Sequence, residues 1–470
     1  MGFNAFSIQI GKTPIDSAFA LTKADSSENR YVRIDKIFII GNKQTKPSII
    51  LRELDVSEGD IFFLPDLRVV LDTDKNKLIN TRLFNSVNIH ILEVDEFLVD
   101  VIIEVKERWY TFPIPIFSLA DRNFNDWIQN HDAKLNRVNY GLRFYQYNFR
   151  GRNERLKAIA QFGFTKKFEL SYTIPYINQA QKNGITIYGG YAENKSIPYK
   201  TEEHKLVFVE SEEVIKETVT AGFTFSRRSS FYNNHYLTLS FNATAISDTV
   251  VDLNRNYLLD GRTNQKYFKL EYTFTRDLRD IQAYPLNGYL FTFEASKLGL
   301  GFFNDIDQTE IKANFNEYIN LGKSYYLSSS LTAQTSFPKK QPYNNFQGLG
   351  YGRDMLRGYE LYVIEGQHYL INKISLKRKL LGGDINIGSI LPIEQFKTIP
   401  LDIYLKIFFD SGLVRNDNYY PENTLFTDEY IYGGGVGFDI VTFYDTVLRL
   451  EYSINKEKES GFFFHFRSDI

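Results

Sequence analysis

From about residue 110 onward, apolar and polar residues alternate along most of the chain with a period of two. Clear runs of this kind occur at 219–225, 237–244, 313–321 and 401–407. Successive side chains of a β-strand point to opposite faces, so each run predicts a strand with one apolar and one polar face. No helical period is sustained in this region. The pattern therefore predicts an antiparallel, mainly β region over the rest of the chain.

Residues 31–107 show a different pattern, in which strand and helix periods follow one another within a short segment. A first strand is closed by the turn residues Gly41 and Asn42, and a long helical pattern covers 65–83. The predicted elements lie at about 32–39, 48–54, 65–83, 86–92 and 98–105, in the order β-α-α-β-β. The predicted domains are 1–30, a tail or the remnant of a targeting segment, 31–107, a small α+β domain, and 108–470, the β region.

The β region has features of a membrane barrel. Its alternating runs are long, they continue without a helix, and the loops between them differ strongly in length. Long polar insertions lie around 201–217, 246–265 and 340–365, whereas Leu321-Gly322-Lys323 makes a short turn. Short turns at one end and long loops at the other are typical of outer-membrane barrels, so we predict a transmembrane antiparallel β-barrel of about 16 strands. A soluble all-β protein is the alternative.

The composition favours strands and excludes several kinds of site. The chain has 40 Phe and 32 Tyr, residues that suit strands and the membrane–water boundary. It has no cysteine, which excludes disulfides and thiolate sites, and its net charge of −2 provides no basic field for nucleic acid. No apolar run is long enough for a membrane-spanning helix. Ala18-Phe19-Ala20 resembles a cleavage site, but no basic residue precedes the apolar stretch before it, so no signal peptide is assigned.

The sequence contains no catalytic or metal-binding motif that we can identify. Its 6 histidines are scattered without metal-ligand spacing, and no serine hydrolase, zinc protease or Walker-type motif occurs. The glycine-rich run Gly348–Gly352 lacks the strand-to-helix context of a phosphate-binding loop. We therefore expect a protein that is not an enzyme and that needs no cofactor or metal.

Short motifs along the chain resemble one family, in the order in which that family carries them. Three segments resemble parts of a POTRA domain: Ile39-Ile40-Gly41-Asn42-Lys43-Gln44-Thr45, Ile50–Leu54 and Leu83-Phe84. Four further segments resemble parts of the barrel that follows such a domain: Asn148–Asn153, Leu170–Tyr176, Thr275-Arg276-Asp277 and Tyr284–Gly288. Over roughly 31–470 the chain is similar to the BamA/TamA superfamily (bacterial surface antigen family) of outer-membrane assembly factors and protein translocators. Its single POTRA-like domain departs from the best-known assembly factors and favours a specialised or accessory member.

Two further motifs resemble a loop of this family and the site that receives it. Leu356-Arg357-Gly358-Tyr359 is similar to the Arg-Gly-aromatic loop tip that folds back into the barrel, and Phe409-Asp410-Ser411-Gly412 resembles the motif of the barrel interior. A guanidinium presents a planar pair of donors that a carboxylate accepts well, so Arg357 and Asp410 are expected to pin the loop. Gly358 permits a tight turn there. For either motif alone, a solvated arginine or an unrelated turn is the simpler alternative.

The two ends of the barrel sequence predict a weak seam. The proposed first strand, at 110–120, contains Pro113 and Pro115, and proline cannot donate to a β-ladder. Its partner would be the last strand, whose phenylalanines share one side: Phe462, Phe464 and Phe466. The resemblance implies that this seam is a lateral gate at which client strands are templated into the membrane. The alternative is that 110–120 is only a linker.

The resemblance also implies that the small domain handles other proteins. Its strand 86–92, with Val87, Ile89 and Ile91, is the expected edge to which an unfolded client adds a strand. The leading hypothesis is an assembly and insertion factor of the bacterial outer membrane, with the small domain in the periplasm. Its expected partners are the lipid bilayer, unfolded or secreted protein clients and accessory assembly proteins, but no nucleic acid. The alternatives are a translocator of one dedicated secreted partner and a surface-exposed structural or binding barrel without transport.

Overall fold

The computed structural model describes residues 29–119, 135–178, 180–350, 354–386, 398–417, 423, 425–442 and 446–467. The chain divides into two compact units. The first contains Met1–Lys43 and Pro47–Glu107, and the second contains Gln44–Lys46 and Arg108–Ile470. The tail expected at 1–30 lies outside the described residues, apart from its last two positions.

The first unit is the small α+β domain that the sequence predicts. Its strands are β1 (Tyr31–Ile40), β2 (Ile61–Phe63), β3 (Phe84–Glu93) and β4 (Leu98–Glu107), and its helices are α2 (Pro47–Leu51) and α3 (Leu64–Asn80). The sheet has the order β2-β1-β4-β3, in which β1 and β4 run parallel and the other neighbours antiparallel. The short strand β2 is absent from the predicted order, because a strand of 3 residues is too short to display an alternation.

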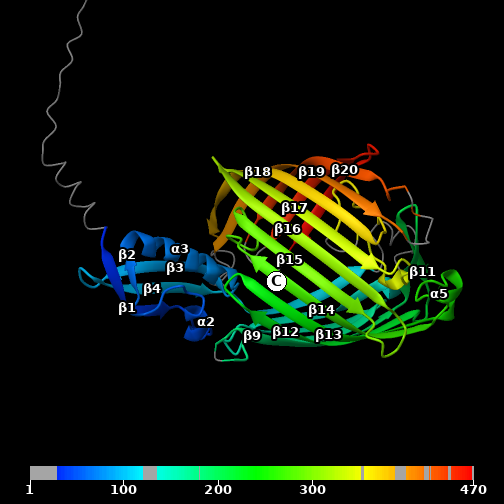
Figure 1. The fold of residues 1–470 in the computed structure, drawn as a ribbon, viewed down its shortest axis with the longest axis horizontal. Coiled ribbons are helices and arrows are strands. Elements are labelled where there is room, and N and C mark those ends of the chain that lie inside the picture. The colour runs from blue at the N-terminus through cyan, green and yellow to red at the C-terminus, as the bar shows by residue number, and fades with distance from the viewer. Residues whose placement is uncertain are drawn as a thin grey trace, which may run out of the picture. The chain divides into compact units, whose positions relative to one another are not determined.

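The core of this unit lies between α3 and one face of the sheet (Figure 1). Leu67, Leu71 and Leu78 of α3 are buried, as are Val99 and Val101 of β4. Positions three, four and seven apart share one side of a helix, and alternate positions of a strand share one side of a sheet. The spacing of apolar residues in the sequence therefore accounts for which face each element buries.

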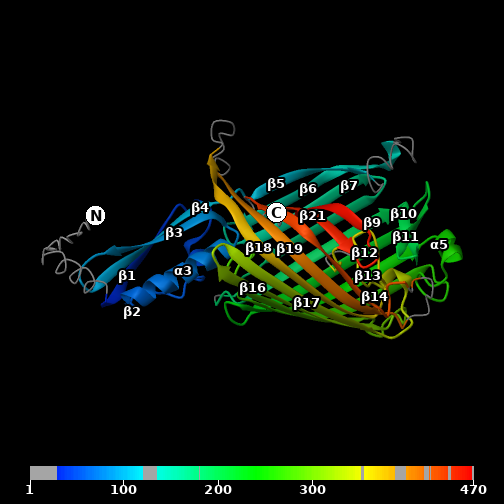
Figure 2. The same ribbon diagram turned by 90° about the horizontal axis from the view of Figure 1, so that it is seen from above.

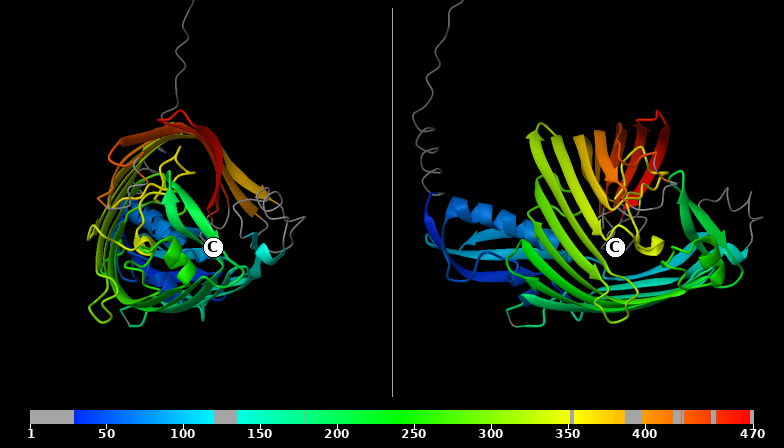
Figure 3. Two further views of the ribbon diagram at one scale, coloured as in Figure 1. Left: turned by 90° about the vertical axis from the view of Figure 1, so that its right-hand side faces the viewer. Right: turned by 45° about the vertical axis from the view of Figure 1, so that its right-hand side comes forward.

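The second unit is built around a 16-stranded sheet in which neighbouring strands are antiparallel, which confirms the predicted barrel. In the order of the chain, the strands are β5 (Thr111–Leu119), β6 (Val138–Phe149), β7 (Glu154–Gly163), β8 (Lys166–Ile174), β9 (Asn183–Asn194), β12 (Lys216–Arg228), β13 (Asn233–Ile246), β14 (Asn264–Asp277), β15 (Gly288–Leu298), β16 (Gln308–Gly322), β17 (Tyr325–Phe337), β18 (His368–Asn386), β19 (Thr398–Arg415), β20 (Tyr430–Val441), β21 (Val447–Asn455) and β22 (Ser460–Arg467). Seen along the barrel, the strands are arranged in a ring (Figure 3, left).

The strands turn apolar side chains outward and polar side chains inward. In β14, Leu270 and Tyr272 are exposed on the outer surface, whereas Lys269 and Glu271 line the interior. Leu239 of β13 pairs with Leu270, so outward apolar side chains of neighbouring strands form a continuous band. An apolar outer band of this kind is what a lipid bilayer requires of a barrel. Within the described ranges, no helix combines the length and the apolar character needed to cross a membrane.

Connections alternate between the two ends of the barrel because neighbouring strands are antiparallel. The three long insertions seen in the sequence fall at one end, after β9, β13 and β17, and this end is called the long-loop end below. Outside the barrel sheet, the second unit contains the 3-10 turn η1 (Leu135–Arg137), the hairpin of β10 (Ser196–Glu202) and β11 (Lys205–Glu210), the helix α5 (Asp248–Leu253) and the 3-10 turn η2 (Tyr343–Asn345). The hairpin forms a two-stranded sheet of its own.

Candidate functional site

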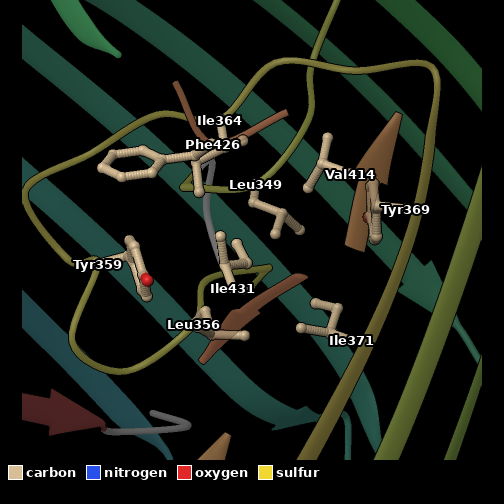
Figure 4. Packing of buried hydrophobic residues seen from close by; sticks show 9 residues of the cluster. All are labelled: Leu349, Leu356, Tyr359, Ile364, Tyr369, Ile371, Val414, Phe426 and Ile431. Atoms are coloured by element: carbon tan, nitrogen blue, oxygen red, sulfur yellow. The ribbon is translucent and has the colours of Figure 1, made fainter. Parts of the chain in front are cut away.

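The described residues of the connection between β17 and β18, 338–350 and 354–367, run inside the barrel (Figure 3, left). Apolar side chains of this loop pack against the wall and against the connection after β19 (Figure 4). The cluster consists of Leu349, Leu356, Tyr359, Ile364, Tyr369, Ile371, Val414, Phe426 and Ile431. Tyr359 is 2% exposed, and its ring centre lies 5.3 Å from that of Phe426. Apolar packing therefore holds the loop against the inner wall.

At the loop tip the structure brings Arg357 and Asp410 together. Nε of Arg357 donates to Oδ2 of Asp410 at 2.8 Å, Nη2 donates to Oδ1, and the backbone N–H of Arg357 donates to Oδ2 at 3.2 Å. Asp410, in β19, is fully buried. A two-pronged pair of this kind fixes direction as well as energy. Without the arginine, Asp410 would be a buried carboxylate that has lost its closest cation, which is costly.

Three side chains outside the two predicted motifs complete the pocket around Arg357. The guanidinium carbon lies 3.9 Å from the centre of the Phe408 ring. Nη2 donates to Oγ of Ser375 at 3.1 Å, and Nη1 donates to Oε1 of Glu451 at 3.4 Å. The pocket thus recognises both the edge and the face of a planar cation, which a lysine cannot match.

Glu451 of β21 connects the loop tip to a second buried ion cluster. Nζ of Lys406 lies 2.8 Å from Oε1 of Glu451 and 2.5 Å from Oδ1 of Asp439. The hydroxyl of Tyr284 donates to Oδ2 of Asp439 at 2.8 Å. These side chains are all buried, so each carboxylate depends on a cation or a hydroxyl for compensation. Sequence reasoning missed this cluster, although its three charged residues stand at inward positions of three neighbouring strands, β19, β20 and β21.

Glycines leave room for the loop tip to approach the wall. Gly358 has a φ of +96°, a backbone conformation that residues with a side chain rarely adopt. A Cβ atom at Gly433 of β20 would lie 2.2 Å from the carbonyl oxygen of Arg357. At Gly412 it would lie 3.3 Å from Cδ1 of Leu356. Sequence reasoning missed Gly433, although the glycine run at 433–435 inside a strand is a sign of close backbone approach.

The interior of the barrel is also polar away from the loop tip. A cavity of about 180 Å³ is bounded by charged side chains of β14, β15 and β16 and by the loop. Lys269 pairs with Glu271 at 2.6 Å, and Lys312 pairs with Asp354. In the part of the chain that the structure describes, no three His, Cys, Asp or Glu residues are grouped as a metal site requires. The interior offers a charged wall that suits water or a polar chain.

The two ends of the 16-stranded sheet are β5 and β22 (Figure 2). β5 pairs with β6 and β22 pairs with β21, and no bridge joins β5 to β22 among the described residues. Pro113 and Pro115 lie in β5 with exposed side chains, so this segment forms a strand and not a linker. Phe462 and Phe464 of β22 are 87% and 63% exposed, and the side chain of Phe466 lies outside what the structure describes. A strand that is paired on one side only can act as a template for another strand.

In the first unit, β3 is an edge strand of the sheet, as the expected client-binding role requires. Its apolar side chains are not available for that role, however. Val87 is 1% exposed, and Ile89 and Ile91 are half-buried on the side of the domain core. We therefore correct the expected contact: the backbone of β3 and its outward residues, Asn88 and His90, form the accessible edge.

Two family models match the chain. The model described as the Omp85 superfamily domain matches residues 148–466, more than half of the chain. The chain belongs to the Omp85 superfamily. The POTRA model, described as the surface antigen variable number repeat, matches residues 32–108. This Omp85 protein is therefore an outer-membrane β-barrel preceded by a POTRA domain.

Two solved structures are similar in fold to this Omp85 protein. BamA from Haemophilus ducreyi, lacking POTRA domains 1-3, has a TM-score of 0.51 and 17% identity, over 93% of this chain and 84% of that chain. CdiB from Escherichia coli has a TM-score of 0.54 and 12% identity, over 97% of this chain and 83% of that chain. At these identities the likeness establishes the fold alone. No curated protein sequence matches the chain.

Proposed function

We propose that this Omp85 protein assembles outer-membrane proteins and inserts client strands at the open edge between β5 and β22. The observation that carries the proposal is that, among the described residues, no ladder joins the end strands β5 and β22. An edge strand offers its backbone N–H and C=O groups to an incoming strand, and pairing satisfies groups that lipid cannot. Folding of the client in the membrane supplies the free energy, so insertion needs no nucleotide.

The POTRA domain would receive the client before insertion. In this proposal it lies in the periplasm, and an extended client segment adds to the backbone of β3. The outward residues of β3 are polar, with Asn88 and His90 between the half-buried isoleucines. Because main-chain hydrogen bonds provide most of such an interaction, clients of different sequence can bind to the same edge.

The pinned loop would stiffen the wall beside the open edge. Arg357 contacts Ser375 of β18, Asp410 of β19 and Glu451 of β21, so a single guanidinium ties three strands of this wall to the loop. The side chain of Asn455, at the end of β21, donates to the carbonyl oxygen of Gly358 at 3.1 Å. Among the described residues, Arg357 makes no hydrogen bond to β22; the same loop reaches only the residue before it, where the hydroxyl of Tyr362 donates to Glu459 at 2.7 Å. The arrangement therefore favours movement of β22 away from β5, while the loop holds strands β18 to β21 together.

The test exchanges the charges of the loop pin. Three variants, Arg357→Glu, Asp410→Arg and the double exchange, are expressed in cells that lack the native protein, and outer-membrane levels of other barrel proteins are measured. Arg415→Glu is the matched control, because Arg415 lies on the same strand as Asp410 but pairs with Asp417 at the barrel end. Resistance of each variant to heat and detergent reports whether its own barrel is folded.

We expect both single variants to remain folded and to lower client levels, since each places like charges in a buried site. The double exchange should restore clients only in part, because a glutamate at 357 would face Glu451. Client levels equal to wild type in all three variants would rule out the proposed role and favour a surface-exposed barrel without transport. Equal losses in the Arg415→Glu control would assign the effect to general destabilisation.

Translocation of one secreted partner is the second candidate function. The charged side chains that line the interior, such as Lys269 and Glu271, favour it, since they suit a polar chain rather than lipid. The same variants separate the two functions. Loss of a single secreted protein from the medium, with normal levels of outer-membrane barrels, would support translocation and contradict assembly.

A further inference from the structure

A cluster of four phenylalanines lies on the outer surface near the long-loop end of the barrel. Phe241 of β13 and Phe268 of β14 are neighbours, with ring centres 5.5 Å apart. The connection between β15 and β16 adds Phe302 and Phe303, whose ring centres lie 5.4 Å and 5.8 Å from that of Phe268. This connection therefore folds back against the outward face of the sheet, where its rings join those of the wall.

Polar contacts fasten the connection in this position. Oδ2 of Asp305 accepts the backbone N–H of Lys266 at 2.7 Å, and Oδ1 accepts Nη1 of Arg262 at 3.0 Å. Gly299 begins the connection with a φ of +83°, and a Cβ atom there would lie 1.7 Å from the carbonyl oxygen of Ile306. The tight turn requires glycine. The position of the two rings is thus built into the loop.

The two loop rings are exposed on the outer surface. Phe302 is 72% exposed and Phe303 is 43% exposed. They continue the outer apolar band formed by residues such as Leu239 and Leu270, which are 45% and 40% exposed. A contiguous apolar surface of this kind marks contact with an apolar partner. Because the patch continues a surface that already faces lipid, lipid is the partner that fits it.

Charged residues stand beside the rings on the side of the long-loop end. Lys266 precedes Phe268 by two positions on the same outward face of β14, and its side chain is exposed. Lys297, on the outward face of β15, pairs with Asp307 of the same connection. At the boundary between acyl chains and headgroups, membrane proteins are expected to carry aromatic rings on the acyl-chain side and lysines on the headgroup side. The lysines therefore mark the headgroup side of the patch, and the four rings lie on the acyl-chain side.

We propose that residues 299–307 form a lipid anchor, in which Phe302 and Phe303 insert among the acyl chains of the leaflet at the long-loop end. The anchor lies opposite the open edge, since seven strands of the sheet stand on each side of the β14–β15 pair. The anchor thus holds this side of the barrel at a set depth in the leaflet, away from the open edge.

The test measures the depth of the ring with a single tryptophan. The native Trp109 and Trp127 are replaced by phenylalanine, and Phe302→Trp is added as the reporter. The full chain is reconstituted in phosphatidylcholine vesicles with or without bromine on the acyl chains, and fluorescence is read with and without iodide in the water. Leu270→Trp serves as the lipid-facing control, and Leu361→Trp, at a position 74% exposed in the long loop, serves as the water-facing control.

We expect brominated chains to quench F302W by about half or more of the fraction lost by L270W, with little effect of iodide. Quenching by iodide, as in L361W, would place the loop in water and overturn the proposal. Quenching by neither agent would show that another protein surface covers the ring, and would overturn it as well. If F302W does not fold, Phe303→Trp is the second reporter. The readout is the depth of a side chain, so it succeeds or fails independently of the proposed function.

Discussion

At Gly433 the backbone of β20 passes so close to the loop tip that a methyl group would lie 2.2 Å from the carbonyl oxygen of Arg357. We predict that Gly433→Ala displaces the tip while the barrel still forms, at a cost of about 1–3 kcal/mol. Arg357 is a site for trypsin once it leaves the pocket, in which its side chain is 13% exposed. Limited trypsin digestion of the folded protein, followed by mass spectrometry, should detect cleavage after Arg357 in this variant and not in wild type.

Gly383 provides the control for this experiment. It lies in β18, and a Cβ atom there would meet no atom within 4 Å. Gly383→Ala should therefore remain protected, although it makes the same change of side chain within a barrel strand. Protection of Arg357 in both variants would show that the tip can shift by the required distance without leaving its pocket, and would refute the close-approach argument.

At the scale of elements, the hairpin β10–β11 is joined to two other connections through His204, which is fully buried in its turn. The carbonyl oxygen of His204 accepts the backbone N–H of Val363 at 2.8 Å, and its backbone N–H donates to Oδ1 of Asn423 at 2.9 Å. Its Nε2 accepts the backbone N–H of Phe426 at 3.0 Å. One residue thus fastens three connections together at the long-loop end.

This latch should loosen in acid. Burial lowers the pKa of the His204 imidazole below its ordinary value of 6.5, because the charged form loses hydration. The released hairpin binds the proton more readily, so the latch is fully stable above about pH 6.5 and weakens as the pH falls below it. Protonation at Nε2 would also place two donors face to face at Phe426.

The chain has no cysteine, so spin labels can be placed at Glu203→Cys and Leu425→Cys, which are exposed positions on the two sides of the latch.

We expect the distribution of spin–spin distances to broaden between about pH 7.5 and pH 5 in the otherwise native chain. His204→Gln is the control, because an amide oxygen can accept the same N–H without titrating in this range. An equal change in both proteins would assign the pH response to groups other than His204 and would refute the proposed latch.

Sequence patterns predicted elements wherever a regular period ran for several residues. The alternation from β6 to β22 and the helical spacing of α3 are of this kind. The hairpin β10–β11 was seen only as part of a polar insertion, because it packs as a separate sheet inside a connection. The loop tip was found through a motif, whereas its partner Glu451 is 94 residues away and has no local signal. Val87 was assigned to a client surface because an alternation does not say which face of an edge strand is covered.

At the scale of the whole molecule, the open edge is what distinguishes assembly from translocation. Insertion requires β5 and β22 to separate in the plane of the membrane, whereas passage through the interior does not. A covalent link across this edge should therefore abolish one activity and spare the other. Pro115 of β5 and Phe464 of β22 both face outward, and the absence of native cysteine makes a Pro115→Cys and Phe464→Cys pair the only thiols in the chain.

We predict that bifunctional thiol reagents of a length that spans the edge stop the insertion of client barrels in reconstituted vesicles, and that cleavable reagents allow recovery on reduction. The control pair is Leu239→Cys and Leu270→Cys, which stand directly opposite each other on the paired strands β13 and β14. Linking that pair joins strands that are already hydrogen-bonded, so insertion should continue. If linking β5 to β22 leaves insertion unchanged while both thiols have reacted, clients do not enter through this edge. Passage of a secreted partner through the interior would then be the function that the barrel supports.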